Sequence, residues 1–369
     1  MEARFTPQIR SFLWGFRKSS YVKEELEPVE VLVDCALGVN PFGCSPTLFR
    51  FLKNNAQALS PYPAYPYLQL RQAISRYWLD TSAVDVREIR VGGGSIAILD
   101  MICKCMIDPG SKVLGFVPQF TDFSACVMSL GGVYEMFPLN AADGYALDVD
   151  AFCDAVGGEH RLVYMDHPNN PTGQAFPLDK IERIAARCRE RGALLVVDEA
   201  YGDFLDKSAS ALSLFPKYDN LCVVRTFSKG FGLAGIRVGY AFIHEPLASC
   251  YDNVGYPFSV SALSAALAEQ ALLDEGFIRS SREAVTRVKS EVLSSLTRLR
   301  AARTHPEVPI CTLFTDADIS LYDMLYKQGV LSEAGEDFAN LGQHAVRIRV
   351  PAEAGALISI LREVERTLA

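Results

Sequence analysis

The stretch Arg225-Thr-Phe-Ser-Lys-Gly-Phe-Gly-Leu-Ala-Gly-Ile-Arg-Val-Gly-Tyr240 places one lysine, Lys229, between a serine and an arginine in glycine-rich backbone. Apolar runs at Leu221–Val224 and Val238–Phe242 predict strands on both sides of this loop. Glycines let the backbone approach a ligand closely, and a lysine amine can condense with an aldehyde. The stretch therefore predicts a loop, bounded by strands, whose amine binds an aldehyde ligand; a solvated surface lysine is the alternative.

Similar apolar runs recur upstream, and helical patterns separate them. They lie at 112–116, 162–165 and 194–197, within a region that extends from about Ile89 to Ile243. This alternation predicts βα units on a mainly parallel sheet with helices on both faces.

The C-terminal third follows a different pattern. Its expected elements are helices at 260–273 and 277–299, strands at 311–315 and 346–350, and helices at 320–328 and 352–367. The second helix is long enough to link two lobes. A chain of 369 residues also exceeds the size at which a single core usually stops growing. We therefore expect a large domain followed by a small α+β domain.

The composition is that of a globular protein, with 49% hydrophobic and 22% charged residues. A net charge of −8 gives no electrostatic reason to bind nucleic acid or an anionic membrane. No apolar run reaches the roughly 18 residues that would suggest a membrane helix. We expect a cytoplasmic metabolic protein with small-molecule partners.

The N-terminal segment Met1–Ser20 mixes basic and aromatic residues but lacks the apolar core of a signal peptide. A transit peptide is one alternative for this segment. Another is an arm that contacts a second subunit, in which Trp14 would take part. The ten cysteines follow no repeated spacing, which favours free thiols. The five histidines show no ligand spacing, so no metal site is expected.

Two upstream segments accompany the lysine loop: His167-Pro-Asn-Asn-Pro-Thr-Gly173 and Leu194-Leu-Val-Val-Asp-Glu-Ala-Tyr201. Together the three segments resemble the fold-type I, class I/II aminotransferases, which use pyridoxal 5'-phosphate (PLP). Within them they resemble the branch of histidinol-phosphate aminotransferases and threonine-phosphate decarboxylases. The resemblance extends from about Asn40 to Arg349.

The resemblance implies an α/β fold-type I transferase. A large domain would contain a mainly parallel seven-stranded sheet sandwiched by helices, and a small α+β domain would follow. The implied division is an N-terminal arm with part of the small domain at 1–45, the PLP-binding domain at 46–275 and the C-terminal small domain at 276–369. It also implies a homodimer with shared active sites, in which Tyr62 reaches the phosphate of the neighbouring subunit. Tyr65 is the alternative to Tyr62.

Five residues match positions at which the family holds the cofactor phosphate. Arg237 would supply a bidentate fork and Ser228 a hydroxyl. Gly94, Ser95 and Ile96 open an expected helix, whose first N–H groups and positive dipole end favour an anion. An ordinary tight turn is the alternative for the glycines.

Four further residues match the positions around the cofactor ring. A carboxylate like Asp198 pairs with the pyridine nitrogen, and Tyr201 and Asn170 bond the ring hydroxyl. Phe120 matches the aromatic residue that stacks on the ring. Ordinary packing or turn roles remain open for them: a helix cap for Asp198, a β-turn for Asn170, and core packing for Phe120 or its neighbour Phe123.

At the substrate end, Arg347 matches an arginine that holds the α-carboxylate through two parallel hydrogen bonds. Arg349 lies two residues further along the expected strand and is the weaker candidate. Gly38, Val39 and Asn40 resemble a segment that lines the substrate side of the pocket. A structural turn is equally open for these three.

One departure from the family pattern concerns the substrate. The histidinol-phosphate and threonine-phosphate enzymes usually carry an arginine shortly after a Gly-Val pair, whereas Gly329-Val-Leu-Ser-Glu333 ends in an acid here. Loss of that cation disfavours a phosphorylated substrate, because a buried unpaired phosphate is costly. A neutral or cationic amino acid becomes the expected donor.

The implied activity is that of an aminotransferase, which moves the amino group of an α-amino acid to a 2-oxo acid through a Schiff base on Lys229. Lys229 would then carry the proton of the 1,3-shift, with Asp198 and Tyr201 as its catalytic partners. A decarboxylase, lyase or cyclase on the same fold is the enzymatic alternative. A binding protein of this fold without turnover is the alternative from another class.

Overall fold

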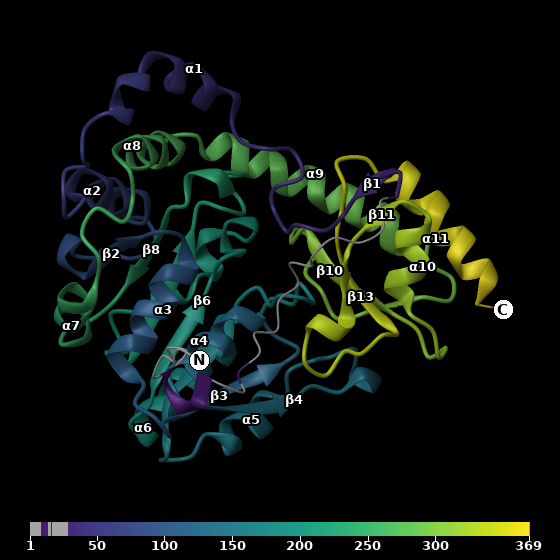
Figure 1. Ribbon diagram of the computed structural model, residues 1–369, viewed down its shortest axis with the longest axis horizontal. Helices are drawn as coiled ribbons and strands as arrows, with labels where there is room; N and C mark the ends of the chain where they lie inside the picture. Colours follow the sequence, from purple (N-terminus) through teal and green to yellow (C-terminus); the bar gives the residue numbers. More distant parts are fainter. Residues whose placement is uncertain (1–8, 14–15, 17–28, 369) are drawn as a thin grey trace, which may run out of the picture.

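The computed structural model describes residues 9–13, 16 and 29–368 (Figure 1). Trp14 and part of the expected N-terminal segment 1–45 lie outside the described residues. Figure 1 shows a larger body, which contains the main sheet, and a smaller one that carries the C-terminal elements. The long helix α9 (Glu275–Ser294) extends from one body to the other.

The main sheet has seven strands, as expected. Its spatial order is β2-β8-β7-β6-β5-β3-β4, and only β8 runs antiparallel to its neighbours. The strands are β2 (Ile89–Gly92), β3 (Lys112–Val117), β4 (Val133–Pro138), β5 (His160–Asp166), β6 (Leu194–Asp198), β7 (Leu221–Thr226) and β8 (Gly239–Phe242). The central strands are almost continuously buried, which is why they read as apolar runs rather than as alternating ones.

Helices cover both faces of this sheet and form two separate apolar cores. On one face α3, α4 and α7 pack on side chains such as Val196 and Val224, and on the other α2, α5, α6 and α8 pack on Val197 and Val223. Successive strand residues point to opposite faces, so each strand supplies both cores. The helices are α1 (Pro46–Asn54), α2 (Leu68–Tyr77), α3 (Ser95–Met106), α4 (Thr121–Ser129), α5 (Val149–Ala155), α6 (Leu178–Arg191), α7 (Leu247–Val254) and α8 (Ala262–Ala271).

The smaller body has its own core around a four-stranded sheet of order β12-β13-β10-β9. Its elements are β9 (Arg300–Ala301), β10 (Ile310–Phe314), α10 (Leu321–Lys327), β11 (Val330–Leu331), β12 (Glu333–Ala334), β13 (Ala345–Arg349) and α11 (Gly355–Thr367). A strand from near the start of the chain joins it, because β1 (Val33–Asp34) pairs in parallel with β11. The residues that follow β1 are thereby held at the junction of the two bodies.

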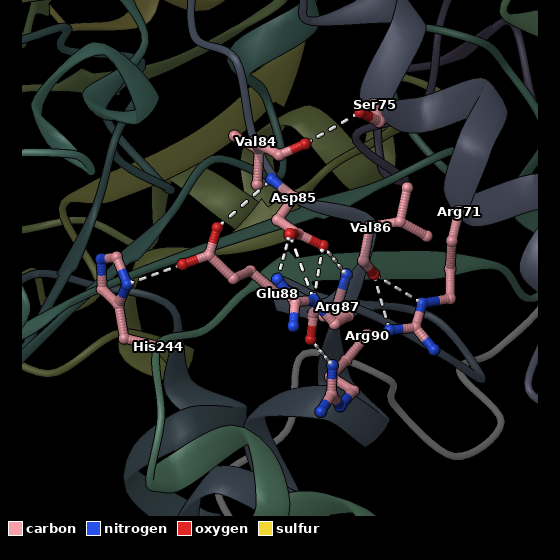
Figure 2. Close-up of polar contacts among 9 residues, drawn as sticks. All are labelled: Arg71, Ser75, Val84, Asp85, Val86, Arg87, Glu88, Arg90 and His244. Carbon is pink, nitrogen blue, oxygen red and sulfur yellow. Dashed lines mark hydrogen bonds and ion pairs between the residues drawn. The ribbon is translucent and has the colours of Figure 1, made fainter.

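The edge strand β2 is fixed by polar contacts on the turn before it (Figure 2). The guanidinium of Arg71 donates two hydrogen bonds to the carbonyl of Val86, at 2.6 and 2.9 Å. The ring of His244, just after β8, lies 3.1 Å from Glu88. These contacts hold β2 in register with β8, and the glycine loop that follows β2 is therefore held at the end of the sheet.

None of the helices in the described part of the chain combines the length and apolar character that crossing a membrane requires.

Candidate active site

A cavity of about 250 Å³ lies at the carboxyl ends of β5, β6 and β7. Ligand sites of open α/β sheets form at this edge, because the strand ends and the loops after them converge there. Ten of the residues singled out in the sequence line it: Val39, Ser95, Ile96, Phe120, Asn170, Asp198, Tyr201, Ser228, Lys229 and Arg237. The three segments quoted from the sequence therefore meet around one space.

Lys229 lies on this cavity with its amine 5.3 Å from the centre of the Tyr201 ring. Removal from water lowers the pKa of Lys229 to about 8, and the positive charges of Arg347 and Arg237 act in the same direction. A lower pKa increases the fraction of neutral amine near pH 7. Lys229 is thus prepared to act as a nucleophile or a base.

Asp198 ends β6 and is almost fully buried. Its carboxylate accepts hydrogen bonds from the hydroxyl of Tyr164 and from the backbone N–H of Ala200, both at 3.0 Å. Burial raises the pKa of Asp198 to about 7, and repulsion from Asp166 adds to the effect. A cation beside Asp198 would bring this pKa down again, so the carboxylate is well placed to pair with a protonated ring nitrogen.

Tyr201 lines the cavity, and its buried hydroxyl has no hydrogen-bond partner among the described residues. The absence of a side chain at Gly38 makes room for it, because a Cβ there would lie 1.8 Å from the Tyr201 oxygen. A buried hydroxyl without a partner costs free energy. Gly38 and Tyr201 thus leave one donor ready for a ligand oxygen.

Asn170 is held between the two bodies of the protein. Its backbone N–H donates to Asp166 at 2.9 Å, and its side-chain oxygen accepts from Arg347 at 3.2 Å.

The sequence analysis missed Asp166, which also lines the cavity. Burial raises the pKa of Asp166 to about 6, while hydrogen bonds to its carboxylate oppose the shift. The signal that could have identified Asp166 is its position at the end of a strand, which it shares with Asp198.

The opposite end of the cavity can hold an anion. The guanidinium of Arg237 lies 3.5 Å from the hydroxyl of Ser228. Gly94 is closely apposed to Arg237, since a Cβ on Gly94 would lie 2.7 Å from its guanidinium. Ser95 is the first residue of α3, and no side chain caps that helix end. Helix-terminal N–H groups, a hydroxyl and a guanidinium are groups with which proteins bind phosphate.

Phe120 and Phe123 have different surroundings. Phe120 lines the cavity at the start of α4. Phe123 is fully buried and stacks on Tyr164 with 3.9 Å between the ring centres. Of the two rings that the sequence left open, Phe120 is therefore the one available to a ligand, and Phe123 packs in the core.

A buried ion network lies behind Lys229. Arg225, on β7, binds Glu199 and also Asp203, the latter at 2.5 Å. All three side chains are at most 2% exposed. Because Glu199 and Asp203 flank the loop of Tyr201, the network ties that loop to the strand that leads into Lys229.

Five residues singled out in the sequence do not line the cavity, namely Gly38, Asn40, Tyr62, Gly94 and Arg347. The side chain of Asn40 donates to the carbonyl of Gly230 at 2.8 Å and to the hydroxyl of Ser281 at 3.0 Å. It therefore anchors the segment around Val39 to the backbone next to Lys229. Tyr62 is 83% exposed, with its ring 5.1 Å from that of Phe258. The described chain does not bring Tyr62 into its own cavity.

The two C-terminal arginines also differ. Arg347 is buried on β13 and contacts both Asn170 and Glu333, the carboxylate of Glu333 at 3.2 Å. Arg349 donates to the carbonyl of Asp34 on β1. Only Arg347 reaches a residue that lines the cavity.

One group of potential metal ligands occurs in the described part of the chain, away from the cavity. Glu135, Glu159 and His160 bring ligand atoms within 4.8 Å of one another. The amine of Lys112 already lies 2.7 Å from Glu135, and the His160 ring binds the same carboxylate at 2.8 Å. The positive charge beside Glu135 is thus supplied by the chain itself.

Comparisons with known proteins show the family of the chain. The family model for aminotransferase class I and II matches residues 35–356. A histidinol-phosphate aminotransferase of Halobacterium salinarum is 32% identical over 337 residues, which cover 88% of each chain.

Solved structures share the fold. A histidinol-phosphate aminotransferase of Sinorhizobium meliloti, solved in complex with pyridoxal 5'-phosphate, superimposes with a TM-score of 0.81 over 99% of each chain at 24% identity. A Thermus thermophilus aspartate aminotransferase mutant gives a TM-score of 0.83 at 21% identity, over 98% of this chain and all of the other. The family match covers nearly the whole described chain, the fold is that of these enzymes, and the protein belongs to the class I and II aminotransferases.

Proposed function

We propose that this protein transfers the amino group of an α-amino acid to a 2-oxo acid with pyridoxal 5'-phosphate bound in the 250 Å³ cavity. The observation that carries the proposal is the placement of Lys229, Asp198 and the phosphate-binding end around one space. The unpartnered hydroxyl of Tyr201 and the uncapped start of α3 fit the phenolic oxygen and the phosphate of this cofactor.

Each end of the cavity has a separate task in this proposal. Arg237, Ser228 and the backbone of Gly94, Ser95 and Ile96 bind the phosphate. Asp198 keeps the ring nitrogen protonated, and Tyr201 and Asn170 bond the phenolic oxygen, while Phe120 stacks on the ring. When bound, the cofactor supplies a protonated ring that withdraws electrons from the substrate Cα.

The amine of Lys229 would hold the cofactor through its aldehyde and, once released, would carry a proton. With a pKa near 8 it would accept the proton from the substrate Cα and deliver it to the former aldehyde carbon, on the other side of the amino nitrogen. Arg347 orients the substrate by binding its α-carboxylate with a two-pronged contact. Gly38 and Val39 bring the N-terminal segment against Tyr201 and cover the substrate side of the cavity.

A homodimer completes the site in this proposal. Tyr62 is exposed beside Tyr65 and Phe258, and their rings contact one another on the surface. Exposed aromatic clusters of this kind mark interaction surfaces. Tyr62 would then bind the phosphate in the partner's cavity.

We also propose domain limits and a location. The large domain would end near residue 275, where α9 begins, and residues up to about 45 would belong to the arm and the small domain. All ten cysteines are free thiols, the state that a reducing compartment maintains. This supports the expected cytoplasmic location.

The test is spectroscopic. Purified protein supplied with the cofactor should show a visible absorption band, and borohydride should then leave the cofactor irreversibly attached to Lys229, as peptide mass spectrometry would locate. Addition of a suitable amino acid should bleach the band, and a 2-oxo acid should restore it. Release of carbon dioxide or ammonia without a 2-oxo acid would contradict transamination and favour a decarboxylase or lyase.

A further inference from the structure

Asp166 is a buried acid on the cavity wall to which the proposed function gives no task. It ends β5, is 3% exposed and lies directly beside Asp198, its partner on the neighbouring parallel strand β6. Both side chains line the cavity. Because a carboxylate is costly to bury, its hydrogen bonds indicate what it contributes to the protein.

Four N–H groups surround this carboxylate, two on each oxygen. Its Oδ2 atom accepts from the backbone N–H groups of Phe120, at 3.3 Å, and Asn170, at 2.9 Å. Its Oδ1 atom accepts from the side-chain amides of Gln119, at 3.2 Å, and Asn169, at 2.9 Å. All four neighbours are donors. This favours the ionised carboxylate, because a carboxylic acid would need an acceptor for its own proton.

The two backbone donors belong to different segments of the chain. Phe120 lies immediately before α4, and Asn170 lies in the loop that follows β5. The proposed function places the ring of Phe120 on the face of the cofactor and the amide of Asn170 at its phenolic oxygen. A single oxygen atom of Asp166 therefore fixes the backbone of two residues that approach the cofactor ring from different sides.

The side chain of Asn170 is held at its other end. Its oxygen accepts from Arg347 at 3.2 Å, whereas its NH2 group donates to no described residue. Asn170 lines the cavity, so this NH2 group is the part of the side chain that remains for an acceptor on a ligand. With the backbone held by Asp166 and the side-chain oxygen held by Arg347, few orientations are left to the NH2 group.

We propose that Asp166 is a positioning residue, whose Oδ2 atom holds Asn170 and Phe120 where they contact the cofactor ring. The inference rests on the proposed function, because that proposal assigns these two residues to the ring. Asp166 acts through its two neighbours rather than through a contact of its own with the ring.

The test compares two cofactor forms that differ only in the ring hydroxyl, pyridoxal 5'-phosphate and its 3-deoxy analogue. Absorbance titration of the cofactor-free protein gives a Kd for each form, and the ratio of the two measures the preference for the hydroxyl. D166A should lower this preference by about tenfold, the size of one hydrogen bond to a charged oxygen. It should also weaken the binding of both forms, because the support of Phe120 is lost as well.

Matched variants separate positioning from a general loss of stability. Q119L removes a donor from the other oxygen and leaves Oδ2 with both backbone partners. It should therefore lower the unfolding free energy in urea titrations but keep the preference. D166N keeps an oxygen that can accept from the two backbone N–H groups, and should restore most of the preference that D166A loses.

A double-mutant cycle links the effect to Asn170. In an N170A background, D166A should cause no further loss of the preference, because the residue that it displaces no longer carries its amide. D166C places a weakly accepting sulfur at the same position and serves as the second variant where D166A does not fold.

The two hypotheses fail differently. If the wild type gives no visible band with pyridoxal 5'-phosphate, the proposed function is wrong. If the band forms but D166A and D166C keep the wild-type preference, or if Q119L lowers the preference as much as D166A does, only the assignment of Asp166 is overturned.

Discussion

The charge of Asp198 should make the cofactor-free enzyme less stable as the pH rises. The carboxyl group has a pKa of about 7 in the folded chain because it is buried, against an ordinary value of 3.8. A carboxyl whose pKa is raised on folding stabilises the folded state most below its unfolded pKa. That contribution is lost as the pH rises through the folded pKa.

The magnitude follows from the shift. About three pKa units correspond to roughly 4 kcal/mol of unfolding free energy, all of it lost once the pH is well above 7. Roughly 1 kcal/mol of this change should fall between pH 6 and pH 8. In D198N the group no longer titrates, and the hydroxyl of Tyr164 can turn to accept from the amide, so packing is retained.

Urea denaturation of the cofactor-free protein at pH 6, 7 and 8 measures the effect. Other groups also titrate in this range. The informative quantity is therefore the slope of the unfolding free energy against pH, compared between the wild type and D198N. D154N, on the exposed side of α5, is the matched control and should keep the wild-type slope. Equal slopes for the wild type and D198N would refute the argument that burial holds Asp198 partly protonated. A steeper loss of stability in D198N would refute it as well.

Three other perturbations test the rest of the site. The rate at which the cofactor attaches to Lys229 should rise as the pH passes about 8, because the neutral amine reacts; stopped-flow absorbance that shows a flat profile from pH 7 to 9 would contradict this. R237A should weaken binding of the phosphorylated cofactor by about ten- to a hundredfold and leave the affinity for unphosphorylated pyridoxal unchanged, as absorbance titration would measure. R225M leaves Glu199 and Asp203 buried without their cation, and should lower the unfolding free energy by about 3 kcal/mol or more in urea titrations. A loss below about 1 kcal/mol would show that the two acids find other partners or become neutral.

The sheet and the residues at its strand ends were predictable from the sequence. Apolar runs of strand length are local signals, and parallel strands bring their carboxyl ends to one edge. Asp198, Asn170 and Lys229 therefore converge without any knowledge of their contacts. The seven-stranded, mainly parallel sheet and the small α+β domain agree with the expectation.

Contacts between distant segments were not predictable in the same way. Asn40 bonds the backbone of Gly230 rather than lining the cavity, and no local pattern encodes that pairing. Asp166 was overlooked because the run at 162–165 ends one residue before it, and an acid after a strand reads equally well as a turn residue. Arg225 stood in the quoted stretch, but its partners depend on how the loop after β6 folds back.

The pairing of β1 with β11 joins two segments that lie far apart in the polypeptide, Val33 with Val330. A ribosome must therefore deliver most of the chain before this parallel ladder can form. Gly38 and Val39 follow β1 directly, so the wall that they build beside Tyr201 takes shape late in biosynthesis. A nascent chain that stops short of β11 would carry Lys229 and Asp198 but would lack the front of its catalytic chamber.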